Sequence, residues 1–366
     1  MKLALRELVR RPGRFVTATV VLTLVAMLLV FLGGLLDGLL RSSTGALRAQ
    51  DADAIVYSDA AEASLVRSRV DPGIRLLVEE LDGVTEVGGL GLVQLGARVP
   101  GNGPRDLADV ALFGYELQPD GVPPAPAEGQ AWADEILQAD GVEVGMTLLL
   151  GPARSPVEVI GFVSDTSFSG QGGLWASPST WRSILADNRP DAQLAEGVYQ
   201  ALVVRGEGDL PTLIDEMTAG ATDSYTIADA VNAIPGVSEQ RSVFNQIIGV
   251  TVVIALVVIA LFFALLTVER TALYGVLKAL GARSSTIFAG LVIQALAVTL
   301  VAATVAGAAA LALDAAIGPG SIPLDVTVSR LVTSIVLLVI AAVAGCGFSL
   351  RRVLRVDPAS AIGTTS

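Results

Sequence analysis

The chain has 366 residues, of which 52% are hydrophobic, and its formal net charge is −12. It contains no histidine, which excludes Ser-His-Asp catalysis and imidazole metal sites, and its single cysteine, Cys346, excludes an intramolecular disulfide and a cysteine zinc cluster. The only lysines, Lys2 and Lys278, do not stand in a G-x-x-x-x-G-K-S/T motif, so the chain is not a P-loop ATPase. We therefore expect no enzyme activity, no catalytic residue, no metal site and no cofactor in this chain.

Long apolar runs dominate the sequence. The four uncharged runs are Phe15–Leu36, Ser242–Val268, Ser284–Leu313 and Leu331–Leu350. Each is long enough to cross a bilayer as a helix, which takes about 20 residues at about 1.5 Å per residue. We predict an α-helical membrane protein with four transmembrane helices, arranged as one plus three, and a large α/β extracytoplasmic domain between helices 1 and 2.

The first apolar run differs from a secretory signal. Its core is about 22 residues long, whereas the apolar region of a signal has roughly 7–15 residues. The following stretch, Asp37–Gln50, keeps helical character through Leu39, Leu40 and Leu47. We therefore expect a retained helix that continues outward as a stalk.

The distribution of charge predicts the orientation. Basic residues outnumber acidic ones in the segment before the first run, in the loop 269–283 and in the tail after residue 350. Short segments rich in Lys and Arg stay in the cytoplasm, so we expect both termini there. Residues 41–241 carry a net charge of −18, which leaves +6 for the remainder. No basic face is available, so a nucleic-acid partner is excluded.

These observations divide the chain as follows. We predict a cytoplasmic amphipathic helix at 1–14, the first span with its stalk at 15–40, the extracytoplasmic domain at 41–241, the second span at 242–268, a cytoplasmic helix at 269–283, the third span at 284–313, a short outer loop at 314–330, the fourth span at 331–350 and a cytoplasmic tail at 351–366.

The segment between the first two spans is predicted to be a mixed α/β domain. Strand-like runs bounded by turn residues lie at Ala54–Tyr57, Gly91–Val99, Val110–Tyr115, Met146–Leu150, Val157–Val163 and Val198–Arg205. Helix-like pieces lie at Gly73–Leu81 and Pro211–Ala219. The stretch Pro119–Gly129 is a loop or an inter-lobe linker, and a second lobe would cover about 91–189.

A short amphipathic helix is predicted between the second and third spans. Ala272, Leu273, Val276, Leu277 and Leu280 recur at helical spacing, and Gly281 is placed to end the helix. Two interpretations remain open. The helix rests on lipid headgroups, or it docks onto a cytoplasmic partner.

The same region resembles a known family. Glu269-Arg270 followed by Gly275–Ala282 looks like the coupling-helix motif of the FtsX-like permease domain, found in macrolide-exporter-type (MacB-like) ABC transporters. The tail Asp357–Ala361 is similar to the C-terminal D-P-A-x-A signature of that family, and Leu3–Phe15 is similar to its N-terminal amphipathic helix. Val144–Leu148 and Val157–Gly161 resemble paired strands of its periplasmic core domain.

The resemblance implies a permease subunit with several passes through the bacterial cytoplasmic membrane. Its partners would be a separate cytoplasmic ATPase that binds ATP and magnesium, a second permease copy, in most cases as a homodimer, and membrane lipid. Movement would pass from the ATPase to the outer domain, which is called mechanotransmission. The residues assigned to ATPase coupling are Glu269, Arg270, Leu273, Tyr274, Leu277, Lys278, Leu280 and Gly281.

Small residues predict close helix packing. Ala302, Ala306 and Ala310 form a small-xxx-small ridge in the third span, and Gly34 and Gly38 are spaced similarly at the outer end of the first. The sequence leaves open whether these ridges pack within one chain or between two copies.

The substrate is indicated only weakly. Ser164–Phe168, followed by Trp175 and Trp181, resembles a segment of the subgroup that contains haem-exporter permeases and the DevC-type permeases of cyanobacterial glycolipid exporters. Haem is therefore a possible substrate, and Met27, the only methionine within a span, is a speculative ligand because a thioether binds haem iron. The alternative for Met27 is ordinary packing. The charged Asp37 and Asp314 are expected in the headgroup region rather than on an ion pathway.

Two functions follow from these observations. The first is ATP-driven export, or extraction from the outer leaflet, of an amphiphilic substrate such as haem, a lipid, a peptide or a drug. The alternative is a transmitter that moves no substrate and activates an extracytoplasmic cell-wall hydrolase. Intramembrane catalysis lacks the acid and base groups that it would need.

Overall fold

The structure is a computed structural model that describes residues 12–103, 105–269, 275–276, 280–317 and 322–354. The chain divides into two compact units. One holds Gly38–Arg241, and the other holds the helical segments on either side of it.

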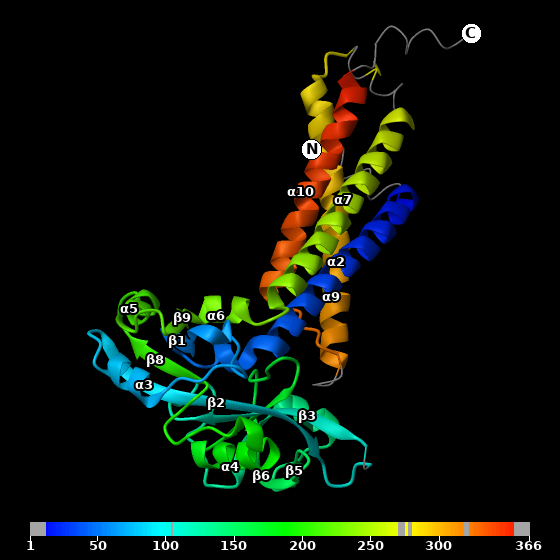
Figure 1. Cartoon of the computed structure of the whole chain (residues 1–366). Coiled ribbons are helices and arrows are strands. Elements are labelled where there is room, and N and C mark those ends of the chain that lie inside the picture. The colour runs from blue at the N-terminus through cyan, green and yellow to red at the C-terminus, as the bar shows by residue number, and fades with distance from the viewer. Residues whose placement is uncertain (1–11, 104, 270–274, 277–279, 318–321, 355–366) are drawn as a thin grey trace. The chain divides into compact units, whose positions relative to one another are not determined.

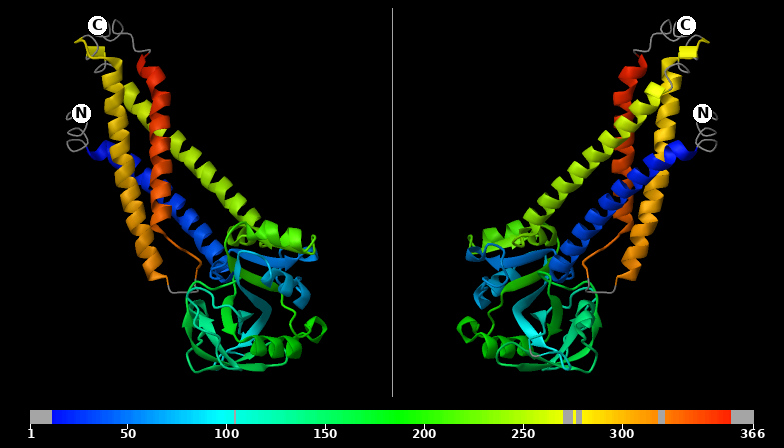
Figure 2. Two further views of the ribbon diagram at one scale, coloured as in Figure 1. Left: turned by 90° about the vertical axis from the view of Figure 1, so that its left-hand side faces the viewer. Right: turned by 90° about the vertical axis from the view of Figure 1, so that its right-hand side faces the viewer.

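Four long helices match the four predicted spans (Figure 1). They are α2 (Pro12–Arg48), α7 (Val237–Glu269), α9 (Ser284–Ala316) and α10 (Val328–Leu354), and each is long and apolar enough to cross a membrane. The bilayer core offers no hydrogen-bonding groups, so a crossing segment must pair its backbone internally, as a helix does. Helix α2 continues beyond the apolar run to Arg48. Figure 2 shows α9 and α10 running side by side.

The unit between α2 and α7 is built on nine strands. These are β1 (Ala54–Ser58), β2 (Val84–Arg98), β3 (Leu107–Tyr115), β4 (Gln130–Asp134), β5 (Thr147–Leu150), β6 (Ser155–Val163), β7 (Gly172–Ala176), β8 (Ala201–Gly206) and β9 (Thr222–Tyr225). The α-helices of this unit are α3 (Pro72–Glu79), α4 (Pro178–Asn188), α5 (Leu210–Met217) and α6 (Ile227–Ala233). An α/β domain between the first two spans is therefore confirmed.

Strand β2 belongs to two parts of the sheet. The strand order is β3-β7-β4-β6-β5-β2-β8-β1-β9, and β2 also pairs with β3, so six strands form a closed ring. The first half of β2, Val84–Leu90, pairs with β8, whereas Leu90–Arg98 pairs with β3. The 15 residues of β2 thus connect the ring to the smaller sheet that contains β1, β8 and β9 (Figure 1).

Every strand expected from the sequence is present, but several elements were missed. Strands β5 and β6 form the predicted hairpin. Strand β2 is longer than predicted, because it begins at Val84, seven residues before the expected start at Gly91. Strands β4, β7 and β9 and helices α4 and α6 were not predicted from the sequence. Strand β7 is buried at all five positions, so it shows no alternation of polar and apolar residues. Strand β9, Thr-Asp-Ser-Tyr, contains no aliphatic residue at all.

The indole of Trp181 lies across a pair of glycines. Gly91 of β2 and Gly114 of β3 face each other in the strand register, and a Cβ at Gly91 would overlap the Trp181 ring. A Cβ at Gly114 would also press on Trp181, whose side chain comes from α4 and is completely buried. The absence of side chains at these two positions lets α4 approach the sheet closely.

We expect Gly91→Ala to destabilise this domain by about 1–3 kcal/mol, the usual range for overpacking a well-filled core. Thermal unfolding of the full chain in detergent, followed by tryptophan fluorescence, measures the change. The matched control is Gly73→Ala in α3, where an added Cβ meets no atom within 4 Å. Equal melting temperatures for the two variants would contradict this account of α4 packing.

Candidate functional site

The predicted coupling segment is described in part. Glu269 is the last residue of α7, Gly275 and Val276 are helical, and the Leu280 amide donates to the Val276 carbonyl at 3.0 Å. Gly281 has a φ of +89°, the left-handed conformation that ends many helices. This geometry agrees with a helix that ends at Gly281. The remaining assigned residues, Arg270, Leu273, Tyr274, Leu277 and Lys278, lie outside the described residues.

The described part of this segment presents apolar side chains. Val276 is 53% exposed and Leu280 is 79% exposed. Exposed apolar side chains of this kind are covered either by lipid or by a partner protein.

The small-residue ridge of α9 is buried within the chain itself. Ala302, Ala306 and Ala310 are each at most 3% exposed, and Ala310 packs in a cluster with Val30 of α2 and Val326. The ridge therefore serves packing within one chain, which is one of the two alternatives that the sequence left open.

An ion pair joins the outer ends of α2 and α10. Arg330 Nε donates to Asp37 Oδ2 at 2.8 Å, and Arg330 Nη2 donates to Asp37 Oδ1, so the pair is bidentate. The side chains are only 18% and 25% exposed, respectively. Gly33, one turn before Asp37, leaves the space that the Arg330 side chain occupies.

Asp37 was expected in the headgroup region, without this partner. The topology of the spans indicates the pairing. It puts the end of the first span and the start of the fourth on the same side, and each carries one charged residue of opposite sign.

Met27 lies on α2 between the buried Ala26 and the exposed Leu28. It is half-buried, at the edge of the helix face that packs within the chain. A haem-ligand role for Met27 remains a proposal.

The outer domain holds a hydrogen-bonded cluster around Glu116. Its carboxylate accepts from Tyr199 Oη at 2.5 Å, from the Gly89 amide at 2.8 Å and from Arg75 Nη1 at 2.6 Å. Burial acts to raise the pKa of Glu116, but the hydrogen bonds from Tyr199 and Gly89 and the charge of Arg75 outweigh it and hold the pKa below its ordinary value. No local motif identifies this cluster, because its members are far apart in the sequence.

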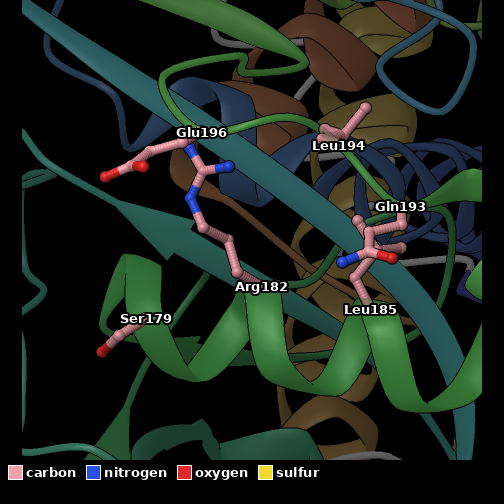
Figure 3. Close-up of a pocket in the computed structure, with 6 residues that line it drawn as sticks. All are labelled: Ser179, Arg182, Leu185, Gln193, Leu194 and Glu196. Carbon is pink, nitrogen blue, oxygen red and sulfur yellow. The ribbon is translucent and has the colours of Figure 1, made fainter.

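A cavity of about 410 Å³ lies beside α4 (Figure 3). Arg182 rises from α4 toward the loop that carries Glu196, and its guanidinium donates to the carbonyl oxygens of Ala195 and Val198. The guanidinium also lies 4.6 Å from the centre of the Tyr199 ring. Because these contacts already use the cation, this cavity is a weak candidate for ligand binding.

Comparison with known families matches residues 245–358, which include α9, most of α7 and the whole coupling segment, to the FtsX-like permease C-terminal domain. These residues are an FtsX-like permease domain. The family resemblance inferred from the sequence motifs is thereby confirmed.

Relatives extend the similarity to the whole chain. A protein of Staphylococcus haemolyticus named hemin transport system permease protein HrtB is 22% identical over 99% of both chains. An uncharacterized ABC transporter permease of Mycobacterium tuberculosis is 32% identical over 48% of this chain and 50% of its own length. The extracellular domain of the noncanonic ABC-type transporter YknZ aligns with 48% of this chain and 100% of its own, at 14% identity and a TM-score of 0.32. The chain is thus similar along its length to ABC transporter permeases, and its residues 245–358 match the FtsX-like permease C-terminal domain.

We expect the Glu116 cluster to make the stability of the permease depend on pH. A carboxylate whose pKa is depressed in the folded state stabilises fully above its unfolded pKa, about 4.3, and loses that contribution as the pH falls through the folded value. The melting temperature of wild type should therefore fall more steeply below about pH 4.3 than that of Glu116→Gln. Glu62→Gln, which alters an exposed carboxylate, is the control and should follow wild type. Parallel curves for wild type and Glu116→Gln would contradict the assignment.

Proposed function

We propose that this permease couples ATP hydrolysis by a separate cytoplasmic ATPase to the export, or extraction from the outer leaflet, of an amphiphilic substrate by mechanotransmission. The ATPase binds ATP and magnesium and docks onto 269–283. The permease acts as a dimer of two copies, with membrane lipid around it and both termini in the cytoplasm.

The observation that carries this proposal is the attachment of α2 at its outer end. The helix contains the first span, and its last turns are fixed within the outer domain. Ala46 and Leu47 are buried in the domain core, and the Ala46 amide donates to the Ser167 carbonyl at 3.0 Å. Arg48 pairs with Asp165 through two hydrogen bonds of 3.0 and 2.7 Å.

A second attachment supports the same proposal. Val237, the first residue of α7, belongs to the same buried cluster as Leu47. Two helices that contain membrane spans therefore end in one hydrophobic core. A displacement of either helix along its axis would act directly on that core, because packed interiors deform little.

The dimer follows from the small number of spans. Four helices are too few to enclose a substrate path alone. Helix α7 leaves a row of apolar side chains exposed in the single chain, among them Val250, Val257 and Leu261. Lipid and the second copy are proposed to cover this surface.

Haem is the first substrate to test. A relative that matches along nearly its whole length is named as a hemin transport permease, and Met27 supplies a thioether within the proposed span. A deletion strain should accumulate more haem and tolerate it less than wild type.

Complementation with Met27→Leu, which preserves size and removes the sulfur, should restore less haem tolerance than complementation with the wild-type gene. Full restoration of haem tolerance by Met27→Leu would exclude Met27 as a ligand. Equal accumulation of every tested amphiphile in the deletion and wild-type strains would favour the hydrolase-activating alternative.

The docking assignment predicts the effect of Leu280→Asp. This residue is exposed, so the substitution should leave the permease folded, whereas a buried charge at the docking surface should weaken ATPase binding by about thirtyfold or more. Pull-down of the ATPase with membrane-extracted permease measures the change. Leu213→Asp, on an exposed position of α5 in the outer domain, is the matched control. Equal recovery of ATPase by the two variants contradicts docking at this helix.

A further inference from the structure

Helices α3 and α5 contact each other on the smaller sheet of the outer domain (Figure 1). Both contribute to one buried cluster with Ala54 and Val56 of β1 and with Leu202 and Val204 of β8. These strand residues alternate along the chain, so the cluster lies on a single face of the sheet. Each helix has eight residues and is about 12 Å long. The other flanks of the two helices face away from the sheet.

Four apolar side chains on these outer flanks are exposed. Leu76 of α3 is 61% exposed, and Leu77 of α3 and Leu213 and Met217 of α5 are each at least 40% exposed. Leu213 and Met217 are four residues apart, so they are neighbours along one flank of α5. Single exposed apolar residues are common on protein surfaces, whereas a group of them marks a place that another molecule covers.

The strand order sets the directions of the two helices. Strands β1 and β2 are parallel, because each pairs antiparallel with β8 between them, and β8 and β9 are parallel for the same reason about β1. Helix α3 connects the first of these pairs and α5 connects the second. Such connections are right-handed crossovers. The two helices therefore run antiparallel to each other.

This arrangement brings the exposed leucines together. Leu77 directly precedes Val78, which is buried against the sheet. Leu213 stands in the same relation to the buried Ile214, so the two leucines occupy equivalent flanks of their helices. On antiparallel helices in right-handed crossovers, these flanks face each other. Leu77 and Leu213 therefore border the seam between α3 and α5, which agrees with their being less exposed than Leu76.

Carboxylates stand beside this seam. Glu80 follows Leu77 by three residues, and Glu216 follows Leu213 by three, so each lies next to an exposed leucine on its helix, and both are exposed. The two helices carry one basic residue, Arg75, which already pairs with two other carboxylates at 2.6 and 2.8 Å. The seam is thus apolar with negatively charged margins. Its six side chains, here called the α3–α5 surface, are Leu76, Leu77, Glu80, Leu213, Glu216 and Met217.

Charge selects what can cover the α3–α5 surface. A second copy of this chain would bring another outer domain, whose residues 41–241 carry a net charge of −18. Phosphate headgroups of lipids are anionic as well, so both would meet like charge. The basic segments of this chain lie, in the proposed orientation, on the other side of the membrane. A partner with apolar side chains flanked by Lys or Arg would complement the surface.

The shape of the surface favours a helix as that partner. A helix packs along the seam of two others through apolar residues spaced i, i+3, i+4 and i+7. Over the length of α3 and α5, about 12 Å, it would contribute about two turns to the contact. Its apolar side chains would cover Leu77, Leu213 and Met217, and its cations would lie beside Glu80 and Glu216.

We propose that the α3–α5 surface docks a basic amphipathic helix of an accessory protein on the outer side of the membrane. This inference concerns a partner of the outer domain, and it is independent of the exported substrate and of the ATPase proposed to dock onto 269–283. It is tested on the permease alone, without ATPase or nucleotide.

The test measures binding of a model helix to the full chain in phosphatidylcholine nanodiscs. The probe is a fluorescein-labelled peptide of about four turns, with leucine at the i, i+3, i+4, i+7 spacing and lysine at the other positions. Its control has glutamate in place of lysine. Fluorescence anisotropy gives the affinities, and nanodiscs without permease give the contribution of lipid. The lysine peptide should bind in a saturable way, at least about tenfold more tightly than the glutamate peptide.

The apolar contact is tested by the double variant Leu77→Ala/Leu213→Ala. It should weaken binding of the lysine peptide by about tenfold or more, because it removes two central apolar anchors. The matched control is Leu107→Ala/Val144→Ala, which truncates exposed apolar residues elsewhere in the outer domain and should bind as wild type does. Melting temperatures of the variants confirm that each is folded.

The charges are tested by Glu80→Lys/Glu216→Lys, which should weaken binding of the lysine peptide by about threefold or more and reduce its dependence on salt. Glu128→Lys/Glu143→Lys changes the net charge equally at exposed positions away from α3 and α5 and is the control. Equal affinity for the lysine and glutamate peptides overturns the proposal. So does equal affinity of either surface variant and its control for the lysine peptide, since the helix would then bind elsewhere.

Discussion

The structure depends on the requirement that a backbone crossing a bilayer pair its polar groups within its own segment. This requirement makes each of the four apolar runs a helix, and it leaves the residues between the first two runs free to form a sheet. The uneven spacing of the four runs, with about 200 residues between the first and the second, places the sheet domain between the first two spans. Helices α2 and α7 each contain both a span and a part of the outer domain, whereas α9 and α10 are joined only by a short connection.

Polar groups in this protein are placed where they fix particular contacts. Asp37 and Arg330 join two spans that are far apart in the sequence, and Gly33 supplies the space for the arginine side chain. In the outer domain, Glu116 gathers Arg75, Tyr199 and the Gly89 amide around one carboxylate. In both places a partly exposed charge pairs with a partner of opposite sign, and at Glu116 a tyrosine hydroxyl and a backbone amide add hydrogen bonds. By contrast, several buried polar atoms have no hydrogen-bond partner among the described residues, including the Tyr57 hydroxyl and the indole nitrogens of Trp175 and Trp181.

The parts of the fold that the sequence predicted well are those encoded locally. Uncharged runs of about 20 residues identify spans without any knowledge of tertiary structure, and the β5–β6 hairpin follows from two apolar segments around a turn rich in proline and glycine. Strand β7 and helix α4 were missed although Ser177 and Pro178 provide an N-cap and a first-turn proline. Strand β7 is buried because it pairs with β3 and β4, and α4 is buried because it packs on the Gly91–Gly114 pair. These contacts join residues far apart in the sequence, so a short stretch of sequence does not reveal them. The candidate site shows the same division. Gly281 was recognised from its place after a periodic segment, whereas the partners of Asp37 and Glu116 are distant in sequence and become visible only when the chain is folded.

The closed ring of six strands has a consequence for how other proteins can recognise the outer domain. Of the nine strands described, only β9 has a single neighbour in the sheet order. A binding partner that extends a sheet by adding its own strand needs an unpaired edge. In this domain such an addition would occur beside Thr222–Tyr225 or beside the first half of β2, Val84–Gly89, which pairs with β8 alone.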